Sequence, residues 1–362
     1  MSRIVYDLIV YVGFLQDNEF FNHEFWLFDI KAFESQMMQE ILKSYKFMNK
    51  FNFIKTGCAI MVAIVVSCRK DTGETSAPAP TSDTIVNYKR QQVQKSKSEQ
   101  HMAYVTSKDG TKIAFEKSGT GPAVIIVSGA LSARSLYEGE PMLLVEKLSK
   151  HFTVYIYDRR GRGESTDEQP YAVRREIEDL ESLIDTAGGR AYLYGVSSGG
   201  ALSLHAAGTL GAAKVQKLAI FEVPYGQGKK IFDRQKQGVN ERIKNGKPGD
   251  AAAFFLSEIG TPPEALKKMK TSLAWRTIEK IDFTLGYDYQ LLGDGAIPRD
   301  LIKTITIPTL VMVGEKSMDF MHATAGQLAM LMPSSEHKKL EGQMHQPKAE
   351  AVAPVLIEFF NK

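Results

Sequence analysis

A serine flanked by glycines is the feature of this sequence that most clearly suggests chemistry. Residues 191–196 have the apolar character of a short strand, and Ser197 follows within the stretch Gly195-Val-Ser-Ser-Gly199. A turn tight enough to join a strand to a helix at Ser197 leaves no room for a Cβ atom two positions before or after it. The spacing therefore predicts an exposed serine nucleophile before a helix. A glycine-rich turn that only packs a helix on a sheet is the alternative interpretation.

A serine hydroxyl needs a base to take its proton at neutral pH. His345 lies in a loop after the last predicted strand, as the chain order serine, acid, histidine requires. His151, His205, His322 and His337 fall on or beside predicted helices and strands. We therefore expect His345 to be the base, with a surface histidine as the alternative. Ser198 is a poorer nucleophile candidate than Ser197, because Val196 stands where that position would need a glycine.

Strand and helix patterns alternate around these residues. Strand-like runs occur at 103–106, 112–116, 123–128, 152–157, 191–196, 215–221, 309–313 and 337–340, and helical patterns at 141–148, 173–184, 201–209, 320–332 and 348–360. This alternation predicts an α/β protein with a mostly parallel, doubly wound sheet. Functional sites in such sheets form at the carboxyl ends of the strands. Residues 223–300 show helical and polar patterns only, which predicts a small helical cap inserted after the sixth strand.

Four motifs, each following a predicted strand, give the region a family resemblance. They are Ser128-Gly129-Ala130, the run from Asp158 to Ser165, the Gly195–Gly199 turn, and Gly342-Gln-Met-His345. Through them, residues 101–362 resemble an α/β-hydrolase of the single-domain kind with one cap. The resemblance implies a triad of serine, histidine and acid that works without a metal ion or an organic cofactor. We interpret the second motif as a structural turn bordering the site, since no phosphate-binding G-x-G-x-x-G is completed.

The acid of the triad is left open by the sequence. The resemblance implies an aspartate three residues after Gly314, the glycine that follows the seventh predicted strand, but Ser317 stands there. Glu222 is the preferred candidate, because an acid that directly follows the apolar end of a strand needs a partner. Asp319 is the second candidate, and Glu315 or no acid at all is the third. Pairing of Glu222 with a lysine or arginine of the cap is its non-catalytic alternative.

The oxyanion hole is expected to consist of two backbone N–H groups, those of Ala130 and Ser198. Many relatives in the family have His-Gly where this chain has Ser128-Gly129. This difference keeps the backbone donor but changes how the loop is held.

The N-terminal part of the chain has the pattern of a secretion signal. Met48 is followed by lysines, then by an apolar run from Cys58 to Val66 and a small residue before Cys68. The run is about half the ~20 residues that a membrane-spanning helix needs, and a buried core helix is a further alternative. The residues before Cys68 resemble a bacterial lipobox, which implies that Cys68 carries several acyl chains. Each buried methylene contributes ~0.8 kcal/mol, so several chains anchor stably.

This interpretation divides the N-terminal part into three segments. Residues 1–47 are a gene-model extension, residues 48–67 a lipoprotein signal peptide, and residues 68–100 a flexible tether rich in Ser, Thr, Pro, Lys and Gln. We therefore expect a membrane-anchored lipoprotein of the bacterial cell envelope, facing the periplasm or the cell surface.

The composition excludes several classes of function. A formal net charge of +3 without a dense basic patch argues against nucleic acid as a partner. The only two cysteines are Cys58 and Cys68, so the catalytic region has neither a disulfide framework nor a cysteine-based metal site. The sequence gives no prediction of the oligomeric state.

The expected activity is carboxylesterase-like: cleavage of an ester or related acyl bond in a small-molecule substrate through an acyl-enzyme on Ser197. Aromatic residues of the predicted cap indicate either a partly apolar pocket or the core of the cap itself; they are Tyr225, Phe254, Phe255, Trp275, Phe283, Tyr287 and Tyr289. A ligand-binding lipoprotein that keeps the scaffold with little or no turnover is the alternative, prompted by the serine at position 317.

Overall fold

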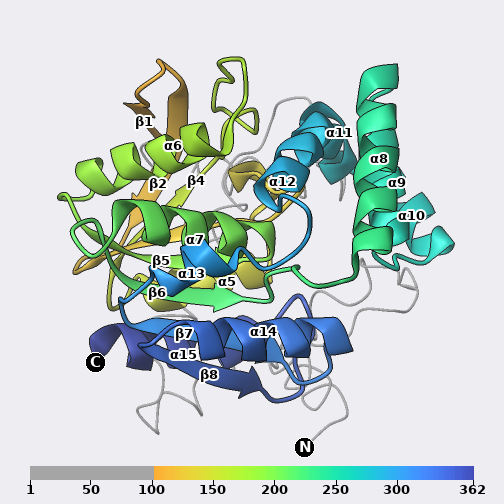
Figure 1. Cartoon of the computed structure of the whole chain (residues 1–362). Coiled ribbons are helices and arrows are strands. Elements are labelled where there is room, and N and C mark those ends of the chain that lie inside the picture. The colour runs from red at the N-terminus through yellow and green to blue at the C-terminus, as the bar shows by residue number, and fades with distance from the viewer. Residues whose placement is uncertain (1–101) are drawn as a thin grey trace, which may run out of the picture. The chain divides into compact units, whose positions relative to one another are not determined.

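The computed structural model describes residues 102–362 (Figure 1). The predictions of an extension, a signal peptide, a tether and a lipidated Cys68 lie outside the described residues. Within the described part of the chain, no helix has both the length and the apolar character needed to cross a membrane.

An eight-stranded sheet with the order β1-β2-β4-β3-β5-β6-β7-β8 forms the centre of the described residues. Its strands are β1 Ala103–Thr106, β2 Lys112–Ser118, β3 Ala123–Val127, β4 Thr153–Tyr157, β5 Ala191–Val196, β6 Val215–Phe221, β7 Thr309–Gly314 and β8 Ser335–Leu340. Strands β3 to β8 pair in parallel, whereas β1 and β2 add an antiparallel edge. The mostly parallel sheet predicted from the sequence is confirmed.

Helices cover both faces of this sheet (Figure 1). One face packs against α6 Val173–Thr186, α7 Ser198–Leu210 and α14 Asp319–Leu331, and the other against α5 Glu140–Leu148 and α15 Ala349–Asn361. Successive side chains of a strand point to opposite faces. In β3, Ile125 and Val127 therefore enter the first core, while Val124 and Ile126 enter the second. Burial on both faces explains why this strand is an unbroken apolar run.

Between β6 and β7 the chain forms the predicted helical cap. Its helices are α8 Lys229–Asn245, α9 Asp250–Glu258, α10 Pro263–Lys270, α11 Leu273–Ile281 and α12 Leu285–Leu291, and α13 Arg299–Lys303 leads back to the sheet. Trp275 is buried in a small core with Ala252 and Ile278, and Tyr287 and Tyr289 are also buried. Trp275 thus belongs to the core of the cap, whereas Tyr289 belongs to the larger core against the sheet, and Tyr287 stacks on Tyr171 outside the cap.

Candidate active site

Ser197 lies between the end of β5 and the start of α7. Its backbone has φ 55° and ψ −127°, a combination that a residue other than glycine adopts only under strain. The N–H of Ser197 donates to the carbonyl oxygen of Phe221 at 2.9 Å, which ties the turn to the end of β6. Helix α7 begins at Ser198, three residues before the start that the composition indicated, because the turn leaves no linker between Ser197 and the helix.

The two glycines around Ser197 occupy positions where no side chain fits. A Cβ on Gly195 would lie 2.4 Å from Ser203 Oγ and 2.6 Å from the carbonyl oxygen of Gly199. A Cβ on Gly199 would lie 2.1 Å from the carbonyl oxygen of Val127. The structure thus gives the physical reason for the Gly-x-Ser-x-Gly spacing.

His345 and Glu222 meet at the carboxyl edge of the sheet. The Nδ1 atom of His345 lies 2.7 Å from Oε2 of Glu222. The Glu222 side chain is fully buried directly after β6, while that of His345 is 40 % exposed. The other carboxylate oxygen of Glu222 accepts hydrogen bonds from the N–H of Gly314, at 2.8 Å, and from the hydroxyl of Ser317. Glu222 thus contacts His345 and the loop after β7, and no cap lysine or arginine pairs with it among the described residues.

The surroundings of Glu222 favour its charged form. Burial raises the pKa of this carboxyl, but hydrogen bonds from His345, Ser317 and Gly314 outweigh burial, and the pKa falls below the ordinary value of 4.5. An ionised carboxylate on Nδ1 can orient a histidine and stabilise the imidazolium that forms when the histidine takes a proton.

The other two acid candidates lie elsewhere. Asp319 is the exposed first residue of α14, and within residues 102–362 it makes no hydrogen bond to His345. Glu315 accepts a hydrogen bond from the N–H of Gly342 at 2.8 Å, so it supports the loop that carries His345. Ser317, which contacts Glu222, is a site residue that the sequence did not identify. Its signal was its place at the position where the family resemblance implied an aspartate.

The loop after β3 lies against the Ser197 turn. A Cβ on Gly129 would lie 3.0 Å from the Ser197 Cβ and 3.1 Å from the carbonyl oxygen of Val196. Within the described residues, the N–H groups of Ala130 and Ser198 donate no hydrogen bond. Both N–H groups therefore have no partner within residues 102–362.

Backbone strain is concentrated around this edge of the sheet. In the described part of the chain, three residues other than glycine have a positive φ: Leu131 at 53°, Ser197 at 55° and Glu222 at 49°. Each follows the carboxyl end of a parallel strand: β3, β5 and β6, respectively. Strain of this kind persists where the surrounding structure enforces it and clusters at functional sites. The residues expected to form the oxyanion loop, the nucleophile and the acid therefore follow three neighbouring strands.

His345 and Ser197 make no hydrogen bond with each other among the described residues. Contacts between a catalytic base and its nucleophile often tighten only when a substrate is bound. The same residues contain no group of three or more His, Cys, Asp and Glu side chains able to hold a metal ion.

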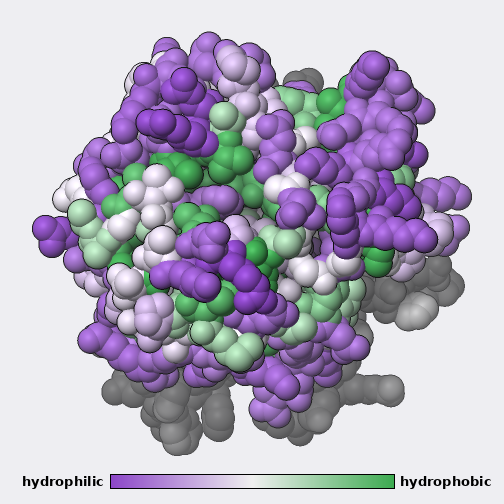
Figure 2. Space-filling model, in the orientation of Figure 1, coloured by the Kyte–Doolittle hydropathy of each residue, from purple (hydrophilic) through white to green (hydrophobic). Residues whose placement is uncertain are grey.

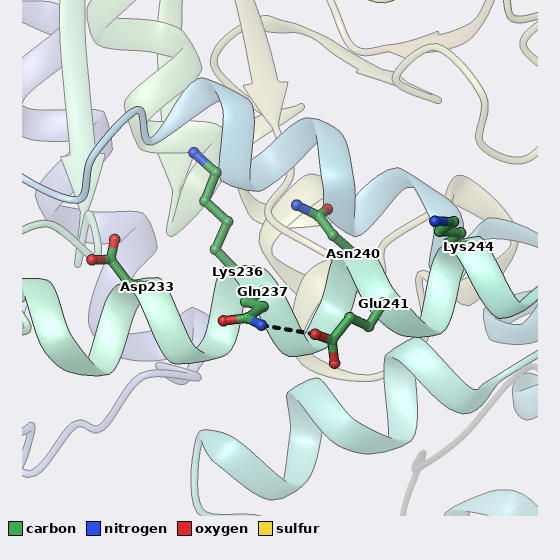
Figure 3. A pocket seen from close by; sticks show the side chains of 6 residues that line it. All are labelled: Asp233, Lys236, Gln237, Asn240, Glu241 and Lys244. Atoms are coloured by element: carbon green, nitrogen blue, oxygen red, sulfur yellow. Dashed lines mark hydrogen bonds between the residues drawn. The ribbon is translucent and has the colours of Figure 1, made fainter.

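A shallow hollow on the cap is a different kind of feature. Figure 3 shows its lining, which comes from α8 alone: Asp233, Lys236, Gln237, Asn240, Glu241 and Lys244. The outer surface of α8 is hydrophilic (Figure 2), and none of the candidate catalytic residues lines the hollow. We therefore place the site at the strand ends and not on α8.

This chain is similar in sequence and in structure to known alpha/beta hydrolases. Residues 124–353 match the profile of the alpha/beta hydrolase family. The structure is similar to the solved alpha/beta hydrolase from Sphaerobacter thermophilus, with a TM-score of 0.65 and 43% sequence identity, over 71% of this chain and 100% of that one.

More distant proteins show the fold alone. An enol-lactonase from Burkholderia xenovorans has a TM-score of 0.57 at 20% identity, over 72% of this chain and 100% of that one. A thermophilic esterase from Thermogutta terrifontis has a TM-score of 0.56 at 22% identity, over 72% of this chain and 98% of that one. A polyketide synthase from Burkholderia thailandensis is 23% identical over 271 residues; the match covers 70% of this chain but spans only 12% of the synthase.

Proposed function

The chain belongs to the alpha/beta hydrolase family, and we propose that it is a serine hydrolase that cleaves an ester or related acyl bond. The observation that carries the proposal is the contact of 2.7 Å between Glu222 and His345, at the same edge of the sheet as the strained Ser197. An acid–histidine pair that can take the proton of a serine hydroxyl is the arrangement that activates this hydroxyl for attack on a carbonyl carbon.

In the proposed reaction, His345 takes the proton of Ser197 as Oγ attacks the substrate carbonyl carbon. The N–H groups of Ala130 and Ser198 stabilise the oxyanion of the tetrahedral intermediate. His345 then gives the proton to the leaving alcohol, and an acyl-enzyme remains on Ser197. A water molecule, deprotonated by His345, then attacks the acyl carbon. The bond from this carbon to Oγ of Ser197 breaks, His345 returns the proton to Oγ, and the carboxylic acid is released. Glu222 holds the ring of His345 and stabilises its charged form in both halves of the reaction.

A carboxylic ester is the substrate class that we propose. The proposed mechanism uses no cofactor. Two proteins of similar structure are named as an esterase and an enol-lactonase, so the fold is known with ester and lactone cleavage. The ligand-binding alternative was prompted by the serine at position 317. That serine now has a role beside Glu222, so it no longer argues for a site without an acid.

The test is covalent labelling with a fluorophosphonate probe together with hydrolysis of p-nitrophenyl acetate. Ser197→Ala should abolish labelling and lower kcat by roughly 10⁴-fold or more. Ser198→Ala is the matched control, because alanine keeps the backbone N–H of the oxyanion hole, and labelling should persist. A wild-type protein that neither reacts with the probe nor cleaves the ester would contradict the proposal and favour a ligand-binding protein.

A further inference from the structure

Four charged side chains form a buried cluster beside the candidate site. Arg159 and Arg162 belong to the turn after β4, Glu176 to α6, and Asp288 to the cap helix α12. Arg159 binds Glu176 with two hydrogen bonds of 2.6 and 2.7 Å, and Asp288 with one of 2.7 Å. Arg162 binds the second oxygen of Asp288 at 2.8 Å. We refer to these residues as the arginine–carboxylate cluster.

All four members of the cluster are charged. Burial raises the pKa of Asp288, but the charges of Arg162 and Arg159 outweigh burial and lower it. Burial acts in the same direction on Glu176, and Arg159 above all lowers its pKa. Two cations and two anions therefore balance. No side chain of the cluster is more than 5% exposed. Desolvation costs several kcal/mol per buried ion, so a cluster of this kind is weak evidence for a purely stabilising role.

The cluster contacts the oxyanion loop directly. Nη1 of Arg162 donates a hydrogen bond of 2.6 Å to the carbonyl oxygen of Gly129. Arg159 makes a longer contact of 3.4 Å with the carbonyl oxygen of Ser128. These two carbonyl groups belong to the loop that resembles the family's oxyanion loop but lacks its histidine.

The hydrogen bond to Gly129 has a geometric consequence for Ala130. Within the described residues the one cis peptide bond is Gln169–Pro170, so the Gly129–Ala130 peptide is trans. In a trans peptide, the C=O and the N–H of the same planar unit point in opposite directions. When Arg162 holds the carbonyl group of Gly129, it also turns the N–H of Ala130 away from the cluster. Gly129 itself lies against Ser197.

We infer that the arginine–carboxylate cluster positions the oxyanion hole, with Arg162 setting the direction of the Ala130 N–H and Asp288 holding Arg162. Both are positioning residues, since neither touches the reacting atoms. The inference rests on the proposed function. Asp288 belongs to α12, so its contact with Arg162 connects the cap to the oxyanion loop. Catalysis therefore requires that the cap is correctly packed.

The decisive variant is the double substitution R162Q/D288N. It removes one cation and one anion, so the cluster stays neutral while the contact with Gly129 is lost. We expect kcat for p-nitrophenyl acetate to fall about 10- to 100-fold, less than the 10²- to 10³-fold loss of an oxyanion donor itself. KM should change less than about threefold. Inhibition by an alkyl trifluoromethyl ketone, whose hemiketal oxyanion needs the same N–H groups, should weaken by a factor similar to the loss in kcat.

R162K is the second variant, should the double variant fold poorly. It keeps the cation, but a lysine ammonium lacks the planar fork that binds Asp288 and Gly129 together. An intermediate loss of kcat is expected.

D179N is the matched control. Arg160, in the same turn as Arg159 and Arg162, forms a buried pair with Asp179 of α6, at 2.7 Å and with side chains no more than 2% exposed. Within the described residues, this pair makes no hydrogen bond to Ser128 or Gly129. D179N should therefore lower the melting temperature and leave kcat within about threefold of the wild type.

Three results would overturn the inference alone: an unchanged kcat in R162K and the double variant, a loss confined to KM, or an equal loss of kcat in D179N. An inactive wild-type protein would instead overturn the proposed function, and this inference with it.

Discussion

At the scale of single residues, the site differs from the pattern implied by the family resemblance in the place of its acid. Glu222 follows β6, and its N–H donates to the carbonyl oxygen of Met312 on β7. Ser317, at the position where the resemblance implied an aspartate, donates its hydroxyl to the carboxylate of Glu222. Position 317 is therefore still part of the site, now as a hydrogen-bond donor to the acid. Serine and glutamate at these two positions work as a pair.

This pairing predicts that the acid can be moved. Glu222→Gln should lower kcat by about 10⁴-fold, since the amide no longer favours the charged histidine. Adding Ser317→Asp to this variant should raise kcat at least tenfold, because position 317 lies beside the carboxylate of Glu222 that His345 contacts. Hydrolysis of p-nitrophenyl acetate measures both values. Ser317→Asp alone is the control and should lower kcat, because two adjacent carboxylates raise the pKa of one of them. A double variant no better than Glu222→Gln would show that position 317 does not reach His345.

The lowered pKa of Glu222 predicts how stability depends on pH. The unfolded chain binds a proton at this carboxyl near the ordinary pKa of 4.5, and the folded protein binds it only at lower pH. Stability therefore rises with pH across this interval. The contribution of Glu222 should be complete above pH 4.5 and should disappear as pH falls through the folded value. Urea unfolding of the wild type and Glu222→Gln at several pH values tests this; a difference that grows on acidification would have the wrong sign.

At the scale of elements, the turn between β5 and α7 depends on glycine for reasons of space. A Cβ on Gly199 would lie 2.1 Å from a backbone carbonyl oxygen of β3, whereas one on Gly326, inside α14, would meet nothing within 4 Å. We predict that Gly199→Ala displaces or unfolds the turn, with loss of probe labelling and a lower melting temperature. Gly326→Ala should stabilise the protein by about 0.5–1 kcal/mol, the usual gain inside a helix. Equal melting temperatures of the two variants would contradict the close packing of β3 against the turn.

Most elements could be predicted from their periodicity, and the exceptions have physical reasons. The central strand β3 is buried on both faces and gives a continuous apolar signal. Strand β8 begins at Ser335, two residues before the predicted start, because its polar residues are largely exposed at the sheet edge and carry no apolar pattern. The order of the strands in the sheet is set by long-range packing, which local periodicity does not contain.

At the scale of the whole molecule, the sequence located the proposed nucleophile and base because each follows a strand and carries a short motif. The arginine–carboxylate cluster could not be found in this way. Asp288 lies 129 residues from Arg159 along the chain and belongs to a cap helix with no motif of its own. Only folding brings the two together, so the connection between cap and oxyanion loop is a property of the tertiary structure.

We propose that the whole chain is a lipoprotein held in the cell envelope by acyl chains on Cys68. The apolar run before this residue is short for a membrane span, so attachment should depend on the lipid. Expressed in a bacterium with its full chain, Cys68→Ser should move from the detergent phase to the aqueous phase in Triton X-114 partitioning, with esterase activity retained. Activity should persist because the candidate site is built from residues 128–345.

Cys58→Ser is the matched control for this prediction. Cys58 lies at the start of the same apolar run, ahead of the expected cleavage point, so its loss should leave the protein in the detergent phase. The intact mass of the mature protein gives an independent measurement, since cleavage before Cys68 and acylation each change the mass by a known amount. A mature protein that retains residues before Cys68, or a Cys68→Ser variant that stays in the detergent phase, would contradict the anchor. The hydrolase proposal would stand in either case, because its residues all lie between Ser128 and His345.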